Sequence, residues 1–148
     1  MFKNINDKKI SKILAKNDQI LSLEDRLIKD YGSEENTLIT YDEIKSLVEG
    51  KWYWVNPGIR YMPIDLLSDI LHLRTVIDNT FNEWWFGFQN HDCWELVVPR
   101  FGEFLDNKNG NTFLAGERKI YKPFEKHNPG AKNGIITNID VYFSKEKF

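Results

Sequence analysis

The sequence has little cysteine and no long apolar run, and each shortage excludes a class of protein. Cys93 is the only cysteine among 148 residues, which excludes an internal disulfide framework and fits a reducing cytosol. The N-terminal stretch MFKNINDKKISKILAKND lacks the unbroken apolar core of a signal peptide. No apolar run approaches the roughly 18 residues that a membrane-spanning helix needs. We therefore expect a cytoplasmic protein without a membrane segment.

The chain also lacks an excess of positive charge. Its formal net charge is −2 and its isoelectric point is about 5.9, so we do not expect direct binding to nucleic acid. The charge is uneven, because residues 63–107 contain eight acidic residues and two basic ones. This acidic middle segment favours a basic protein partner.

Aromatic side chains, in contrast, are abundant and make up 14% of the residues. They bury large areas, and Trp and Tyr are also favoured anchors of binding surfaces. The length of the chain predicts a single globular domain over residues 1–148, large enough to bury a core.

Two helices are expected before residue 51. Apolar residues with a period of 3.5 predict a long helix over residues 8–31, which packs on its own domain or forms a homodimer. A short helix is expected over residues 40–50. Thr40 is its N-cap, and Glu43 follows three residues later, as in a capping box.

A third helix is expected over residues 63–81. Pro63 suits its first position, and a wide apolar face would make this helix the centre of the core. His72 would lie on its solvated stripe. Arg74 falls in the apolar arc, where Asp78, one turn later, could neutralise its charge.

The C-terminal half has the alternation and β-branched content of strands. Strands are expected at residues 51–55, 83–88, 93–98, 116–124 and 135–143. Residues 89–92 would form the tip of a hairpin, and residues 106–111 a loop. Helices first and strands later predict an α+β fold, in which N-terminal helices pack on a mostly antiparallel sheet in the C-terminal half.

The hairpin NEWWFGFQNHDCWELVVPRFG, residues 82–102, carries the favoured functional hypothesis. Alternation predicts that one apolar face, which includes Trp94, Leu96 and Val98, belongs to the core. The opposite face would present a tryptophan among acids. The predicted partner-binding residues are Glu83, Trp85, Asp92 and Glu95.

An aromatic anchor ringed by carboxylates complements a surface rich in Lys and Arg. We therefore expect a protein-binding inhibitor of the toxin-immunity or phage counter-defence type. It would mask a basic partner, such as a nuclease or another nucleic-acid-binding effector, without catalysing a reaction.

The alternative hypothesis is a small hydrolase or transferase that uses His91 with a nearby carboxylate. A catalytic His91–Cys93 pair is disfavoured, because neighbours two apart on a strand lie roughly 6–7 Å from one another. Cys93 is more simply interpreted as a small buried hydrophobic residue. The histidines and Cys93 show no zinc-type spacing, so the sequence predicts neither a metal site nor a cofactor.

Overall fold

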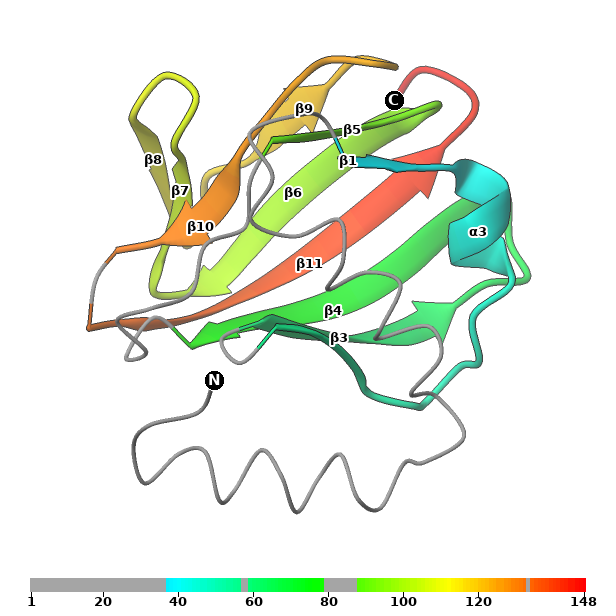
Figure 1. Cartoon of the computed structure of the whole chain (residues 1–148), viewed down its shortest axis with the longest axis horizontal. Coiled ribbons are helices and arrows are strands. Elements are labelled where there is room, and N and C mark those ends of the chain that lie inside the picture. The colour runs from blue at the N-terminus through cyan, green and yellow to red at the C-terminus, as the bar shows by residue number, and fades with distance from the viewer. Residues whose placement is uncertain (1–36, 57–58, 79–87, 133) are drawn as a thin grey trace.

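The computed structural model describes residues 37–56, 59–78, 88–132 and 134–148, and over these ranges the protein is almost entirely β (Figure 1). One short helix, α3 (Tyr41–Lys45), occurs within these ranges. The predicted α+β fold, with helices packed on a sheet, is therefore wrong. The strands are β1 (Thr37–Ile39), β2 (Tyr53–Asn56), β3 (Ile59–Asp65), β4 (Ile70–Asp78), β5 (Gln89–His91), β6 (Trp94–Phe101), β7 (Glu103–Asp106), β8 (Asn111–Leu114), β9 (Lys119–Tyr121), β10 (Pro129–Ala131) and β11 (Ile136–Ser144).

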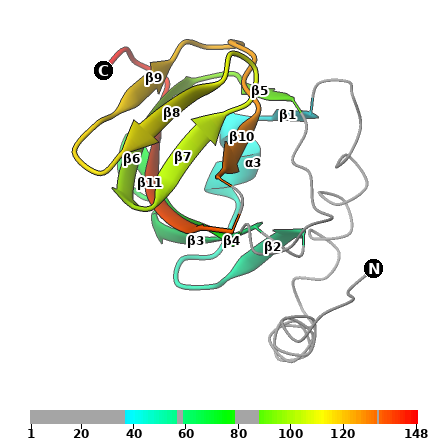
Figure 2. The same ribbon diagram turned by 90° about the vertical axis from the view of Figure 1, so that its left-hand side faces the viewer.

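The strands form one large antiparallel sheet and two small sheets. The large sheet has the order β2-β3-β4-β11-β6-β9, and its middle strand β11 pairs with β4 and β6. A three-stranded antiparallel sheet has the order β10-β7-β8, and β1 pairs with β5 in parallel. Figure 2 shows the three-stranded sheet across from the large one, and in Figure 1 α3 lies at one end of the large sheet.

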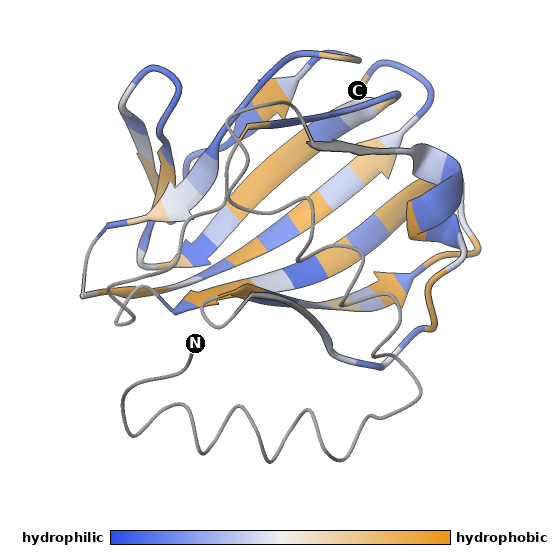
Figure 3. Cartoon of the chain, in the orientation of Figure 1, coloured by the Kyte–Doolittle hydropathy of each residue, from blue (hydrophilic) through white to orange (hydrophobic). Residues whose placement is uncertain are grey.

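The core fills the space between the sheets and is built from side chains that alternate along the strands. Figure 3 shows apolar and polar residues alternating along β4, β6 and β11. The inward residues include Leu71, Val97, Phe104 and Phe143, each at most 4% exposed.

No helix in the described ranges is long and apolar enough to cross a membrane.

Over residues 63–78, the described part of the helix predicted at 63–81, the structure has the end of β3, a tight turn and β4. Burial along β4 alternates with the two-residue period of a strand. The buried side chains include Leu71, Leu73 and Ile77, whereas His72 and Arg74 are only half-buried. The turn is fixed by Asp65, whose Oδ1 accepts hydrogen bonds from the backbone N–H groups of Leu67 and Ser68 at 3.0 and 3.2 Å.

Arg74 does not pair with Asp78 as predicted. On an extended strand, residues four apart are not brought together as they are on a helix. The Arg74 Nε atom instead lies 3.2 Å from Oδ1 of Asp140 on β11, the neighbouring strand.

The start of the short helix is confirmed. The Thr40 side chain accepts a hydrogen bond from the Glu43 backbone N–H at 3.2 Å, so Thr40 is the N-cap. The helix ends at Lys45, earlier than the predicted residue 50. The predicted helix over residues 8–31, together with any homodimer through it, lies outside the described residues.

Of the predicted hairpin over residues 83–98, the second strand, residues 93–98, is confirmed as β6, but the tip at residues 89–92 is wrong. Its predicted tip forms strand β5, and β6 pairs with β11 and β9. The first predicted strand, residues 83–88, falls mostly outside the described ranges. The predicted loop at 106–111 connects β7 to β8, and the strand predicted at 135–143 is confirmed as β11. The strand predicted at 116–124 is much shorter, because only Lys119–Tyr121 forms β9.

The face of β6 that turns inward is the opposite of the predicted one. Cys93, Glu95 and Val97 are 1%, 6% and 0% exposed, whereas Trp94 and Leu96 are half-buried. Since side chains alternate, choosing the wrong face moves every residue of the strand to the other side of the sheet. The inward face of β6 therefore carries a carboxylate into the core.

Candidate metal centre

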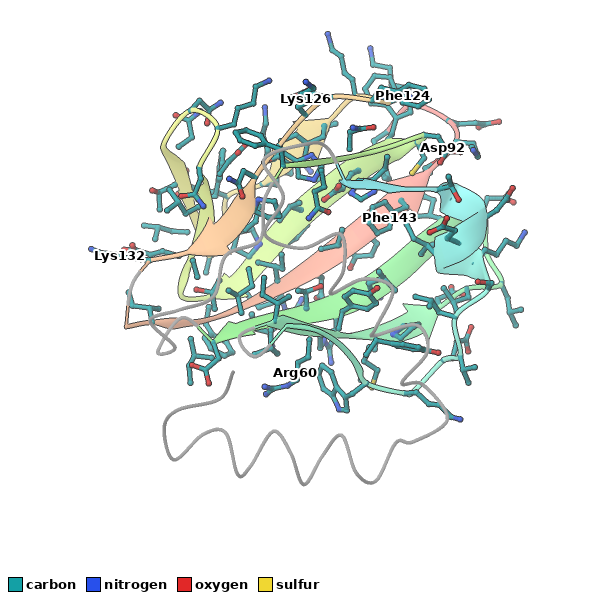
Figure 4. All side chains as sticks on the ribbon, viewed as in Figure 1. Arg60, Asp92, Phe124, Lys126, Lys132 and Phe143 are labelled. Carbon is teal, nitrogen blue, oxygen red and sulfur yellow. The ribbon has the colours of Figure 1, made fainter. Side chains whose placement is uncertain are left out.

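Two side chains of the site come from neighbouring positions at the join of β5 and β6. His91 ends β5 and Glu95 lies on β6, and both are nearly buried, at 5% and 6% exposed. The His91 ring packs edge-on against Phe143 of β11 at a centroid distance of 5.1 Å. Figure 4 shows Phe143 in the interior and Asp92 at the edge where β5 leads into β6. The packing holds His91 beside the inward face of β6.

The third side chain, His127, comes from the segment that follows β9. Its backbone pairs with Gln89 of β5 through hydrogen bonds of 2.8 and 3.0 Å, which places it beside His91. Its ring stacks on Tyr121 at 4.3 Å and is 1% exposed. Phe124 and Lys126 of the same segment lie at the outer edge of the structure in Figure 4.

A hydrogen bond decides which nitrogen of His127 faces the site. Nδ1 lies 3.1 Å from the carbonyl oxygen of Glu125, and because a carbonyl can only accept, Nδ1 carries a proton. In the neutral ring, Nε2 then presents a lone pair. This arrangement, in which the outer nitrogen is held by a carbonyl, is the one that metal-binding histidines use.

One carboxylate oxygen meets both rings. Glu95 Oε1 lies 3.0 Å from His91 Nε2 and 3.2 Å from His127 Nε2, and one ligand atom from each residue falls within 4.8 Å of the others. Neither Glu95 Oε1 nor His127 Nε2 makes a hydrogen bond, although both are buried. A neutral His127 would therefore set a lone pair against a carboxylate. The contact requires a positive charge, either a proton on Nε2 or a bound cation.

The electrostatics of the pair agree with that requirement. Burial alone would raise the pKa of Glu95, but the two histidines outweigh it and lower that pKa well below 4.5. Burial alone would lower the pKa of His127, but the Glu95 carboxylate outweighs it and raises that pKa above 6.5. Without a metal, the site is an ion pair that holds a proton.

The unfolding free energy of the metal-free protein should depend on pH because of this proton on His127. Because the folded pKa of His127 is raised, its contribution is fully present below pH 6.5 and is lost as the pH rises through the folded value. We expect the difference in unfolding free energy between the natural chain and His127→Gln to shrink from pH 6 towards pH 9. Urea unfolding of both chains at each pH, in the presence of a chelator, measures this difference in unfolding free energy. A difference that stays constant with pH would contradict the positive charge assigned to His127.

A buried pair behind His127 holds its ring in place. The Tyr121 hydroxyl donates to Asp106 Oδ2 at 2.9 Å, and both residues are almost fully buried. Asp106 Oδ1 also accepts from the backbone N–H of Asn128 at 3.1 Å, next to His127. Burial and then Asp106 raise the pKa of Tyr121, so this hydroxyl stays protonated and acts as a donor.

Cys93 lies between His91 and Glu95 in sequence but does not act as a nucleophile. The residue is 1% exposed, and burial, followed by the charge of Glu95, raises the pKa of its thiol to about 12. A thiol that remains protonated at neutral pH is a weak nucleophile. The prediction that Cys93 is a small buried residue is confirmed.

The predicted partner-binding residues are not gathered on one surface in the part that the structure describes. Asp92 is half-buried, and its carboxylate accepts from the Tyr41 backbone N–H at 2.6 Å and from Lys145 at 3.0 Å. Glu95 faces the two histidines. Glu83 and Trp85 lie outside the described residues, so their role stays a prediction.

A second charged cluster lies on the outer face of the large sheet. Asp140, 1% exposed, has His72 Nε2 at 3.0 Å, and Arg74 and Arg100 at 3.2 and 3.4 Å. The His72 ring also stacks on Tyr142. His72 therefore does not occupy the solvated helix stripe that the sequence predicted. Two arginines beside one carboxylate disfavour a metal ion here.

Sequence reasoning missed the centre because it searched for zinc-type spacing. His91 and Glu95 are four residues apart across the join of two strands, and His127 follows 32 residues later. The usable signal was a histidine and a glutamate four residues apart, an even spacing, on either side of a strand boundary. Nothing local in the sequence points to His127 as the third member.

Comparisons with known proteins identify the fold. No protein-family model matches the sequence, and no curated protein matches it. Among solved structures, the complex of Rhodobacter sphaeroides SigE with the anti-sigma ChrR matches 70% of this chain and 55% of its own chain, with 19% identity and a TM-score of 0.54. An RmlC-like cupin from Shewanella frigidimarina matches over 69% of this chain and 92% of its own, with 12% identity and a TM-score of 0.54. KdgF from Halomonas matches over 66% and 88%, with 15% identity and a TM-score of 0.53.

These findings overturn the predicted inhibitor of the immunity or counter-defence type. Among the described residues the predicted acidic face is broken, because Glu95 turns into the core beside two histidines. The alternative that His91 serves a hydrolase or transferase with a nearby carboxylate has no support in the comparisons either. Since identities this low show the fold alone, the conclusion is that the chain has a cupin-like fold.

Proposed function

We propose that this cupin-like domain binds one divalent transition-metal ion through His91, Glu95 and His127. The observation that carries the proposal is the buried contact at 3.2 Å between His127 Nε2 and Glu95 Oε1, which needs a positive charge, in a cluster of three ligand atoms that lie within 4.8 Å of one another. A metal ion satisfies both atoms and the nearby His91 Nε2. Two imidazoles and one carboxylate are a donor set used by catalytic zinc and by non-heme iron.

The surrounding residues support a functional metal rather than a purely structural one. Three protein ligands leave positions open, where a bound divalent metal acts as a Lewis acid on a ligand oxygen. The chain's own groups hold the site. Tyr121 and Asp106 fix the His127 ring, and the Glu125 carbonyl holds the proton on Nδ1. Apolar residues around the site limit the access of water.

The test is a metal titration of the full chain after chelation and dialysis. We expect about one Mn²⁺, Fe²⁺, Co²⁺ or Zn²⁺ ion per chain and a higher melting temperature in its presence, because a ligand bound only to the folded state stabilises it. The affinity should fall as the pH falls, since protons compete for the histidines. A chain that binds none of these ions would refute the proposal.

Three broader expectations remain proposals. One domain over residues 1–148 is supported by the single core cluster shared by the described residues. A protein partner is supported by one neighbour of the same fold, which is a complex between SigE and the anti-sigma ChrR. The cytoplasmic location rests on the sequence alone.

A further inference from the structure

Gln89 has an unpaired polar group beside the proposed metal centre. Gln89 is 5% exposed, and its side-chain amide nitrogen Nε2 is buried without a hydrogen-bond partner. Its backbone N–H and carbonyl are both bonded to His127, so the backbone at Gln89 is held in place. A buried donor left unpaired is destabilising. The side chain is therefore a candidate donor to a bound molecule.

Gln89 lines a small cavity together with His91 and Glu95. Residues 89 and 91 are two apart on β5, so their side chains share one face of the strand. The cavity has a volume of about 70 Å³, and most of its other lining residues are apolar, including Leu73 and Val141. Since one water needs roughly 10–15 Å³ on this scale, the cavity suits a ligand of about five to seven non-hydrogen atoms.

The net charge of the metal-bound site determines which charge on that ligand fits best. A divalent ion with one carboxylate, Glu95, and two neutral imidazoles leaves a net charge of about +1 in a buried setting. An uncompensated buried charge is unfavourable, so a ligand with a single negative charge fits best. This step rests on the proposed metal binding.

We infer that the site takes a short aliphatic monocarboxylate. Its carboxylate faces the metal and accepts a hydrogen bond from the Gln89 amide, and its alkyl chain packs against the apolar wall. Gln89 is thereby a specificity-determining residue. Its donor recognises an oxygen acceptor and leaves an alkylammonium group, which has no acceptor, unmatched.

The experiment uses the full chain loaded with Co²⁺ and butyrate as the probe, followed by calorimetry and by the Co²⁺ absorption spectrum. We expect butyrate to bind more tightly than butylamine, which has the opposite charge, and than succinate, whose second carboxylate meets the apolar wall. Gln89→Met keeps the size and removes the donor, and it should weaken butyrate binding by at least about tenfold. Its Co²⁺ content and melting temperature should stay near those of the natural chain.

Asn138→Leu is the matched control, because Asn138 Oδ1 is also buried without a hydrogen-bond partner but Asn138 does not line this cavity. It should leave butyrate affinity unchanged. A natural chain without bound Co²⁺ would refute the metal proposal itself. A loaded chain that does not prefer butyrate, or that loses as much affinity in Asn138→Leu as in Gln89→Met, would overturn the present inference alone.

Discussion

His127→Ala and Glu95→Ala are expected to lower the affinity for a divalent metal by more than about 100-fold, since even partners outside the ligand shell contribute 10- to 100-fold. Each change removes one of the three donor atoms that lie within 4.8 Å of one another. Competition with a chelator of known affinity measures the loss. His91→Ala should behave in the same way.

His72→Ala provides the matched control, because His72 is the one remaining histidine of the chain. It lies beside Asp140 and two arginines on the outer face of the large sheet, where those positive charges disfavour a cation. Its metal affinity should equal that of the natural chain. If His72→Ala lost the metal and His127→Ala kept it, the assigned centre would be wrong.

Gly102→Ala is expected to destabilise the fold by about 2–6 kcal/mol. Gly102 joins β6 to β7, where the chain leaves the large sheet for the small one, and its φ is +80°. An added Cβ would lie 2.5 Å from Thr137 Oγ1 and 2.6 Å from the Ile136 carbonyl oxygen. Thr137 cannot yield easily, because it is fully buried and bonded to the Glu103 backbone at 3.1 and 3.2 Å.

Gly110→Ala separates backbone strain from the clash. Gly110 has a similar φ of +75°, but nothing lies within 4 Å of an added Cβ. Its substitution should cost about 1–2 kcal/mol from the left-handed conformation alone. Chemical unfolding of both variants gives the comparison. Equal losses at the two positions would show that the close approach to Thr137 does not constrain the corner.

Strands and turns were predictable where the local signal was unambiguous. Thr40 was found as the N-cap because capping depends on one side chain and a nearby backbone group. The predicted strand over residues 135–143 matches β11 to within one residue at each end, since it is rich in β-branched and aromatic residues, and β9 occupies the centre of another predicted segment. These features need no knowledge of the tertiary structure.

The segment of residues 63–81 shows why the fold class was wrong. Its apolar residues fit both a helical face and the inward face of a strand, and Pro63 suits a helix start as well as an extended segment. The choice is made by tertiary pairing, since β4 finds partners on both sides in β3 and β11. Sequence periodicity alone could not reveal those partners.

The site was missed for a similar reason. On β6, both faces carry large apolar residues, and Glu95 seemed to mark the wet face. Glu95 is buried instead because His91 and His127 compensate its charge, which is the condition for burying a carboxylate. His127 is brought there by its backbone pairing with Gln89, a long-range contact without a local signature.

The most direct test of the metal centre is X-ray absorption spectroscopy of the Zn²⁺-loaded chain. The account predicts a shell with two imidazole nitrogens at roughly 2.0–2.1 Å and carboxylate oxygen at a similar distance, and loss of one imidazole contribution in His127→Ala. A shell of oxygen donors without imidazole, or one that His127→Ala leaves unchanged, would contradict it.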